Sequence, residues 1–188
     1  ILLVTRDMGV TWYGKEIYSN AGGSTLWAWG YNNYGSLGQN DIVQRSSPCQ
    51  VMSSNAWTMT GSERLQVNMH QNDGTMWVWG WNADIGALGL NEAVGKYSSP
   101  VQLGTAATWV NNVGDQGGCH AVKTDGTLWT WGSNVEGQLG QNQAPAQLGA
   151  TSSPVQIPGT TWKEVQNARD ANMAIKTDGT LWTWGKNE

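Results

Sequence analysis

Four stretches of the chain share one pattern of apolar and polar positions, in which two tryptophans alternate with other apolar or β-branched residues and a glycine follows. Side chains alternate between the two faces of a strand, so each tryptophan pair lies on one face and the intervening residues lie on the other. Both faces then carry bulk, which is typical of a strand that is covered on both sides. The pattern predicts four such strands, at Leu26–Gly30, Met76–Gly80, Leu128–Gly132 and Leu181–Gly185.

The third copy shows the rest of the repeating unit most clearly. An Asp-Gly pair within Thr124–Thr127 separates two β-prone runs and indicates a tight hairpin, because both residues tolerate positive φ. The glycine-spaced segment that follows predicts a structured loop, in which Asn134 bonds neighbouring backbone amides. Pro154 is placed at the entrance of the last strand, where no ladder N–H is needed. The unit is therefore all-β, with predicted strands at Thr108–Val110, His120–Lys123, Leu128–Trp131 and Ser152–Ile157.

The four phrases close on glycines at positions 30, 80, 132 and 185, which are 50, 52 and 53 residues apart. Four-stranded units that repeat at such a period stack side by side as the blades of a β-propeller. A β-solenoid, the alternative architecture, repeats at far shorter periods. Because every blade needs the same packing, the recurring tryptophans are predicted to be structural core: Trp27, Trp29, Trp77, Trp79, Trp129, Trp131, Trp182 and Trp184.

Composition agrees with a core built on tryptophan, since the chain has 13 Trp, no Phe and only 13% charged residues. The net charge is −4 and no Lys/Arg cluster is present, which argues against direct nucleic-acid binding. No apolar run approaches the roughly 20 residues that span a bilayer, and the apolar start is too short for a signal peptide. The sequence therefore favours a soluble protein and leaves an extracellular, virion or cytoplasmic location open. Its first residue is Ile rather than Met, which predicts processing or an excerpt from a longer chain.

Three segments resemble the repeat signature of the regulator of chromosome condensation family: Trp29–Gly38, Trp79–Gly89, which has one extra residue, and Trp131–Gly140. The Asp-Gly hairpins and a recurring Ser-Ser-Pro-Val-Gln strand also stand where that family places them. The resemblance runs from about Gly22 to the end of the chain. Residues 1–21 match poorly and are interpreted as a degenerate first blade or a leader.

Members of that family form seven-bladed propellers, so the resemblance implies about twice the repeats present here. We therefore expect residues 1–188 to form a single partial propeller domain of the regulator-of-chromosome-condensation type, with about 3.5 four-stranded blades in an incomplete ring. The blade motifs end near residues 30, 80, 132 and 185. Missing repeats would close the ring, or alternatively a second copy of the chain would do so.

The candidates for catalytic chemistry are few, and we expect neither an enzyme nor a bound cofactor. His70 stands where two other copies have Val122 and Ile175, and His120 likewise does not recur, so both are interpreted as hydrogen-bonded or surface residues. No group of His, Cys or carboxylates has metal-ligand spacing. The aspartates that recur in the hairpins are explained by turn chemistry.

The two cysteines do not fix the redox compartment. Cys49 stands where other copies have valine and is interpreted as a small core residue. A disulfide between Cys49 and Cys119 is the disfavoured alternative.

Function is sought where the copies differ. Tyr31 and Trp81 directly follow the Trp-Gly phrase in two copies, and Tyr34 lies on the same predicted loop as Tyr31. Aromatic side chains of this kind supply contact area for a protein or for sugar rings. The alternative interpretation is that they pack against the next blade.

Three functions follow from these features. The main hypothesis is a non-enzymatic scaffold whose loops bind a protein partner. An extracellular or virion-fibre adhesion module that binds a host protein or a glycan is the alternative, suggested by a surface rich in amides and hydroxyls. Nucleotide exchange on a small GTPase, which the resemblance implies, is disfavoured because no copy has room for an inserted wedge and the chain has no basic tail.

Overall fold

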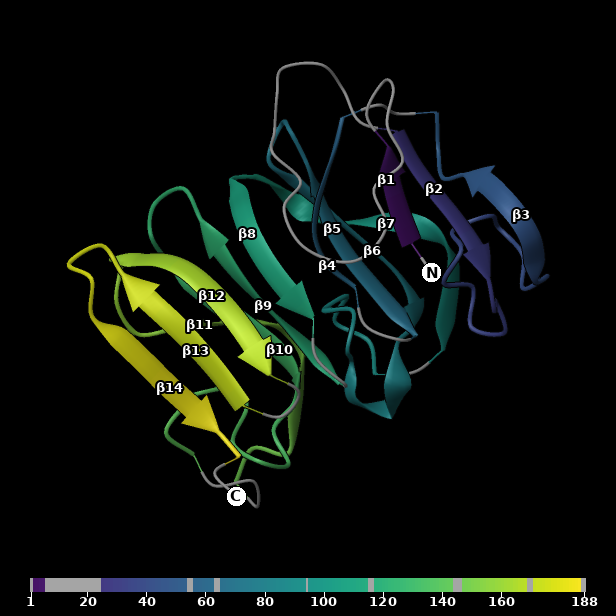
Figure 1. The fold of residues 1–188 in the computed structure, drawn as a ribbon. Coiled ribbons are helices and arrows are strands. Elements are labelled where there is room, and N and C mark those ends of the chain that lie inside the picture. The colour runs from purple at the N-terminus through teal and green to yellow at the C-terminus, as the bar shows by residue number, and fades with distance from the viewer. Residues whose placement is uncertain are drawn as a thin grey trace.

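The protein is described by a computed structural model, and the chain folds into four antiparallel sheets placed side by side (Figure 1). The structure describes residues 2–5, 25–53, 56–62, 65–93, 95–114, 117–143, 147–168 and 171–186. Two inner sheets have four strands each, and the first and last described sheets have three. The all-β prediction and the repeated blade are therefore confirmed.

The strands follow one another in chain order within each sheet. Sheet 1 contains β1 (Leu2–Thr5), β2 (Thr25–Gly30) and β3 (Arg45–Gln50). Sheet 2 contains β4 (Trp57–Ser62), β5 (Gln66–Gln71), β6 (Thr75–Trp81) and β7 (Lys96–Ala107). Sheet 3 contains β8 (Trp109–Gly114), β9 (Gly118–Lys123), β10 (Leu128–Ser133) and β11 (Ala150–Ile157). Sheet 4 contains β12 (Trp162–Ala168), β13 (Ala171–Lys176) and β14 (Leu181–Gly185).

The hydrophobic core lies between sheets, as the propeller interpretation requires. β8 contacts β4 and β5 of sheet 2, and β12 contacts β8 and β9 of sheet 3. Each of the three apolar clusters combines side chains of two adjacent sheets: one between sheets 1 and 2, one between sheets 2 and 3, and one between sheets 3 and 4. The fold is thus stabilised by face-to-face packing of successive blades.

In sheets 2 and 4 the second tryptophan of the phrase is hydrogen-bonded to the preceding sheet. The Trp79 indole N–H donates to the Ser36 carbonyl at 3.0 Å, and that of Trp184 donates to the Gln138 carbonyl at 2.7 Å. Both acceptors lie in the glycine-spaced loop of the preceding sheet. A Cβ added at Gly140 would lie 3.0 Å from the Trp184 indole nitrogen, so close ring approach requires glycine there.

Trp131 of sheet 3 differs from these two tryptophans. It is fully buried, but its indole nitrogen has no hydrogen-bond partner. The preceding loop is the one with an extra residue, which folds into the short 3₁₀ helix η1 (Ala83–Ile85). Gly86 and Gly89 nevertheless keep the positive φ of Gly35 and Gly38, so the insertion alone does not explain the missing bond.

The first tryptophan of each phrase lies at the rim of the core, where its indole N–H donates to a threonine two residues earlier. Trp77 and Trp129 are half-buried. Trp182 is 49% exposed, so the prediction that it belongs to the core is wrong for this fold. The equivalent strands of sheets 2 and 3 are each covered by a fourth strand, whereas no fourth strand adjoins β14 among the described residues.

The Asp-Gly hairpins confirm the turn prediction. In sheet 3 the Asp125 carboxylate accepts the backbone N–H and the hydroxyl of Thr127, at 3.0 and 2.6 Å. Asp73 and Asp178 make the same pair of bonds in sheets 2 and 4. These bonds lower the pKa of all three aspartates, which are therefore ionised at neutral pH.

Three sequence predictions need correction or lie outside the described residues. Pro154 does not open its strand but lies within β11, an edge strand, next to a register shift. Cys49 is only half-buried; its thiol donates to the Ala28 carbonyl at 3.0 Å, and no disulfide joins Cys49 to Cys119. β1 pairs with β2, but the remainder of the predicted leader, from residue 6 onward, lies outside the described residues.

Candidate functional site

The three loop aromatics singled out in the sequence lie in one row. The ring centroids of Tyr31 and Tyr34 are 6.3 Å apart with the rings tilted by 49°, and those of Tyr34 and Trp81 are 5.2 Å apart with a tilt of 39°. Tyr31 and Trp81 are 50% and 36% exposed, and Tyr34 is half-buried between them. We call Tyr31, Tyr34 and Trp81 the aromatic ridge. It crosses from sheet 1 to sheet 2.

The local fold explains why these rings meet. Gly30 and Gly80 end their tryptophan phrases with φ of 106° and 96°, a conformation that favours glycine and turns the following residue outward. Tyr31 and Trp81 are those following residues. Tyr34 thus packs against Trp81 of the next sheet, while Tyr31 and Trp81 remain accessible.

Buried asparagines hold the loops of the ridge in shape. The Asn32 side chain is fully buried, accepts the Leu37 backbone N–H at 2.8 Å and donates to the Asp41 carbonyl at 3.0 Å. Asn82 accepts the Leu88 N–H at 2.9 Å in the next loop, and Asn134 does the same in the third, as predicted. The ridge is thus presented on loops whose backbone is fixed by internal hydrogen bonds.

Two cationic side chains near the ridge are held by hydrogen bonds to neighbouring residues. Arg45 forms an ion pair with Asp41 at 2.6 Å, and the Val43 backbone N–H together with Arg45 lowers the pKa of Asp41. Lys96, the cross-strand neighbour of Trp81, donates to the Asn33 carbonyl at 3.1 Å. The ridge therefore offers aromatic area with one ammonium group, that of Lys96, beside Trp81.

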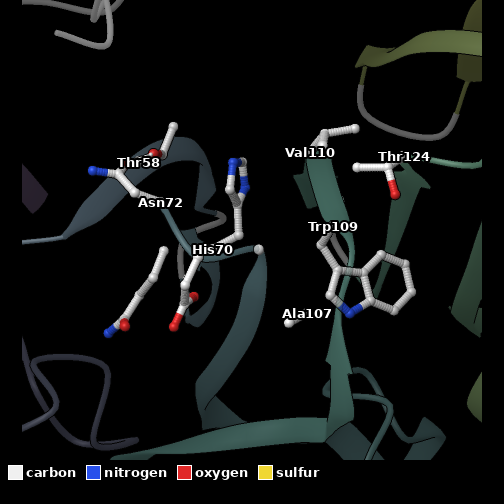
Figure 2. Close-up of a pocket in the computed structure, with 10 residues that line it drawn as sticks. Thr58, His70, Asn72, Ala107, Trp109, Val110 and Thr124 are labelled. Atoms are coloured by element: carbon white, nitrogen blue, oxygen red, sulfur yellow. Dashed lines mark hydrogen bonds between the residues drawn. The ribbon is translucent and has the colours of Figure 1, made fainter. Parts of the chain in front are cut away.

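A groove lies at the opposite end of β6 from the aromatic ridge, beside the Asp-Gly hairpins. It has a volume of about 340 Å³ and lies between sheets 2 and 3. Figure 2 shows Thr58 and His70 on one side of it and Trp109, Val110 and Thr124 on the other. We call it the hairpin-end groove; it is lined by Thr58, His70, Gln71, Asn72, Asp73, Gly74, Ala107, Trp109, Val110 and Thr124.

Beneath this groove a buried polar pair joins sheets 2 and 3. The His70 Nδ1 lies 3.0 Å from the Asn112 amide oxygen, which only accepts, so Nδ1 carries the proton. The Asn112 amide group also donates to the Asn68 carbonyl at 2.9 Å. Burial lowers the pKa of His70, and the bond to Asn112 opposes that shift only in part. We call His70 and Asn112 the polar bridge.

The sequence interpretation of His70 as a hydrogen-bonded residue is confirmed, but the sequence did not reveal its partner or the groove above it. Its one signal was the alignment of His70 with Val122 and Ile175. Strand register shows that Asn112 likewise stands where sheet 4 has Val165. Two polar residues therefore replace valines at adjoining positions, which is visible only once the sheets are stacked.

The described part of the chain holds no group of three or more His, Cys, Asp or Glu that would bind a metal ion. Among the same residues, no helix is long and apolar enough to cross a membrane. His70 and His120, the two histidines, are both buried on different sheets. Neither lies in the aromatic ridge.

Comparison with known proteins identifies the repeats. The family model of the regulator of chromosome condensation (RCC1) repeat matches residues 24–60 and 125–169. The ultraviolet-B receptor UVR8 of Arabidopsis thaliana is 26% identical over 168 residues, which cover 87% of this chain and 38% of the receptor.

Solved structures agree on the fold. Human WBSCR16 superposes with a TM-score of 0.72 and 21% identity, over 88% of this chain and 43% of that one. Prp20p of Saccharomyces cerevisiae, a protein studied for its binding to Gsp1p and histones, superposes with a TM-score of 0.68 and 17% identity, over 86% and 41% of the two chains. The chain thus spans about two fifths of the length of these relatives.

Proposed function

The chain carries RCC1 repeats in a partial RCC1-like β-propeller domain that covers most of its length, and from this premise we propose that it is a non-enzymatic scaffold that binds a protein partner through the aromatic ridge. The binding face is the end of the propeller where the glycine-spaced loops emerge. No catalytic step is assigned to it.

The observation that carries the proposal is the continuity of the ridge across two sheets. Tyr31 and Trp81 expose aromatic surface next to each other although 50 residues separate them in the chain. Tyrosine and tryptophan are enriched where protein interfaces gain most of their binding energy, because they bury large areas at a low cost in side-chain entropy. A ridge on rigid loops adds preorganisation, which lowers the entropic cost of binding further.

The relatives lend support at the level of the fold. Prp20p, an RCC1-type propeller, is a protein whose binding to Gsp1p and histones has been studied. A propeller of this type is therefore suited to presenting loops to other proteins. We propose the same general role here, with a partner chosen by the ridge.

The test compares the natural protein with a variant that lacks the ridge. Tyr31→Ala and Trp81→Ala together should reduce the recovery of a specific partner from the lysate of the source cells at least tenfold, since each aromatic anchor typically contributes over 1 kcal/mol. Val135→Ala is the matched control, because Val135 is 62% exposed on the equivalent loop of sheet 3 but lies outside the ridge. Equal recovery by all three proteins would contradict the proposal.

Two further measurements separate the remaining functions. Binding to a glycan array that depends on Tyr31 and Trp81 would favour the adhesion module over a protein scaffold. Acceleration of GDP release from a small GTPase would overturn the non-enzymatic assignment.

A further inference from the structure

The hairpin-end groove is complete within the described chain. One wall comes from β4, β5 and the Asn72–Gly74 turn of sheet 2, and the other comes from β8 and Thr124 of sheet 3. The groove and the aromatic ridge lie at opposite ends of β6, so a site here is independent of the ridge.

The polar groups that line the groove are mostly uncharged. Thr58 and Thr124 supply hydroxyls, and Asn72 supplies an amide whose oxygen accepts the Thr58 hydroxyl at 2.8 Å. Trp109 and Val110 add an apolar wall. Hydroxyl and amide groups beside an apolar wall are suited to a ligand that both donates and accepts hydrogen bonds.

Asp73 carries the single formal charge among the lining residues at neutral pH. Hydrogen bonds from Thr75 lower its pKa, so it is ionised, whereas burial lowers the pKa of His70 and keeps the imidazole neutral. The lining therefore carries one negative charge, while outside it the Lys123 ammonium lies 4.5 Å from the ring centroid of Trp109. A ligand that binds beside Asp73 should be neutral or cationic, because that carboxylate repels phosphates and carboxylates.

The interface between sheets 3 and 4 has an apolar residue at the strand position that His70 occupies between sheets 2 and 3. Between sheets 3 and 4, Val122 takes the strand position of His70, and Lys163 takes that of Val110. Val122 is buried in an apolar cluster. The polar floor between sheets 2 and 3 is therefore not a requirement of the fold.

We infer that the hairpin-end groove is a binding site for a small, hydroxyl-rich ligand without negative charge, of the size of a monosaccharide. Its rim hydroxyls and the Asn72 amide bond the ligand hydroxyls. The Asp73 carboxylate selects against anionic forms of the same ring.

The test uses three probes with one ring and three charges: glucose, glucosamine and glucuronate. Ligand-observed NMR titrations of the intact chain at pH 7 should show millimolar-range binding of glucose and glucosamine. Glucuronate should bind about five- to tenfold more weakly than glucose, because its carboxylate approaches Asp73 in a partly solvated groove. Absence of binding by all three sugars, or equal binding of glucuronate and glucose, would overturn the proposal.

Matched variants locate the site. Thr124→Val removes one rim hydroxyl and should weaken glucose binding about three- to tenfold, the worth of one hydrogen bond. Thr177→Val is its control, because Thr177 stands at the same turn position in sheet 4 and its backbone N–H makes the equivalent bond to Thr161, 2.8 Å long. Equal effects of the two variants would place the binding elsewhere.

A second pair of variants tests the role of the Asp73 charge. Asp73→Asn keeps an oxygen for Thr75 but removes the negative charge, so the preference for glucose over glucuronate should disappear. Asp178→Asn alters the same turn in sheet 4 and should leave the preference unchanged. A preference that survives Asp73→Asn would contradict the assigned role of this carboxylate.

Discussion

The two interfaces that flank sheet 3 are built from equivalent strands but differ in chemistry at one pair of positions. Between sheets 2 and 3 the polar bridge joins His70 and Asn112 by a 3.0 Å hydrogen bond. Between sheets 3 and 4 the same strand positions hold Val122 and Val165, which are both buried in one apolar cluster. The comparison shows that the blade accommodates either pair.

The polar pair and the valine pair differ in how much the free energy of unfolding falls when one partner is replaced. A buried polar group costs free energy unless it is hydrogen-bonded, whereas replacing both partners with apolar groups is close to neutral. A buried valine pair therefore loses less stability than a buried polar pair when only one of its partners is replaced by an apolar residue. The polar bridge departs from the apolar pairing that the repeat uses at the next interface. Such local departures are typical of functional sites, and this one lies beside a groove.

The largest effect is expected from placing a polar group in the apolar interface. Val165→Asn buries an amide where Val122 offers no partner, and it should lower the free energy of unfolding by about 3 kcal/mol. Urea unfolding followed by tryptophan fluorescence measures the change. Val165→Ala, which also removes apolar contacts but adds no polar group, is the control. A smaller loss for Val165→Asn than for Val165→Ala would show that this interface accepts an amide.

Breaking the polar bridge from one side should cost somewhat less. Asn112→Val removes the acceptor of the His70 Nδ1 proton and the donor to the Asn68 carbonyl, with an expected loss of about 2 kcal/mol. Adding His70→Val recreates the valine pair of the next interface and should recover stability to within about 1 kcal/mol of the natural protein. If the double variant is less stable than Asn112→Val alone, the equivalence of the two interfaces fails.

The polar bridge should also make stability depend on pH. Burial holds the pKa of His70 below its ordinary value of 6.5, so the folded state binds the proton less readily than the unfolded state. Its contribution is then fully present above about pH 6.5 and is lost as the pH falls towards the lower pKa of the folded state, by up to about 1.4 kcal/mol per pH unit. The His70→Val/Asn112→Val protein should lose less stability between pH 7.5 and 5 in urea unfolding.

The carboxylates do not obscure this measurement. Asp73, Asp125 and Asp178 have pKa values lowered by threonine hydrogen bonds, so they lose their contribution at pH values below about 4. They are present in both proteins. Parallel pH curves for the two proteins would refute the assigned role of His70.

Much of the fold could be predicted from the sequence because it is local and repeated. The Asp-Gly hairpins, the buried Asn134 and the Trp-x-Trp strands depend on residues within one unit. Burial of Trp182 was predicted wrongly for the same reason, since its alignment describes its strand but not whether another strand covers it. The sequence pattern of one repeat determines the strands of its blade, whereas the packing of neighbouring strands and sheets determines which side chains are exposed to solvent.

The sites could be predicted only in part, because they are made between units. Tyr31, Tyr34 and Trp81 were recognised as variable aromatics, but their contact requires sheets 1 and 2 to be stacked. The bridge from His70 to Asn112 spans 42 residues, and neither residue predicts the other. In a repeat protein, residues that differ between copies can be assigned a partner only when the contacting faces of adjacent sheets are known.

The smallest expected effect extends the comparison to the outer turns of the sheets. Lys123 lies 4.5 and 4.4 Å from the ring centroids of Trp109 and Trp129, a cation held between two indoles. Sheet 2 has Gln71 at this position, opposite Trp57 in the strand register. Gln71→Lys should therefore raise the free energy of unfolding by about 0.5–1 kcal/mol.

The reverse change provides the control, since Lys123→Gln should lose a similar amount in the same urea experiment. Destabilisation by Gln71→Lys together with no effect of Lys123→Gln would show that the cation is a bystander. Gln71 also lines the hairpin-end groove, so a lysine there places a positive charge beside Asp73. Glucosamine binding should then weaken relative to glucose binding. The same substitution therefore tests both the stability of this turn and the charge preference of the groove.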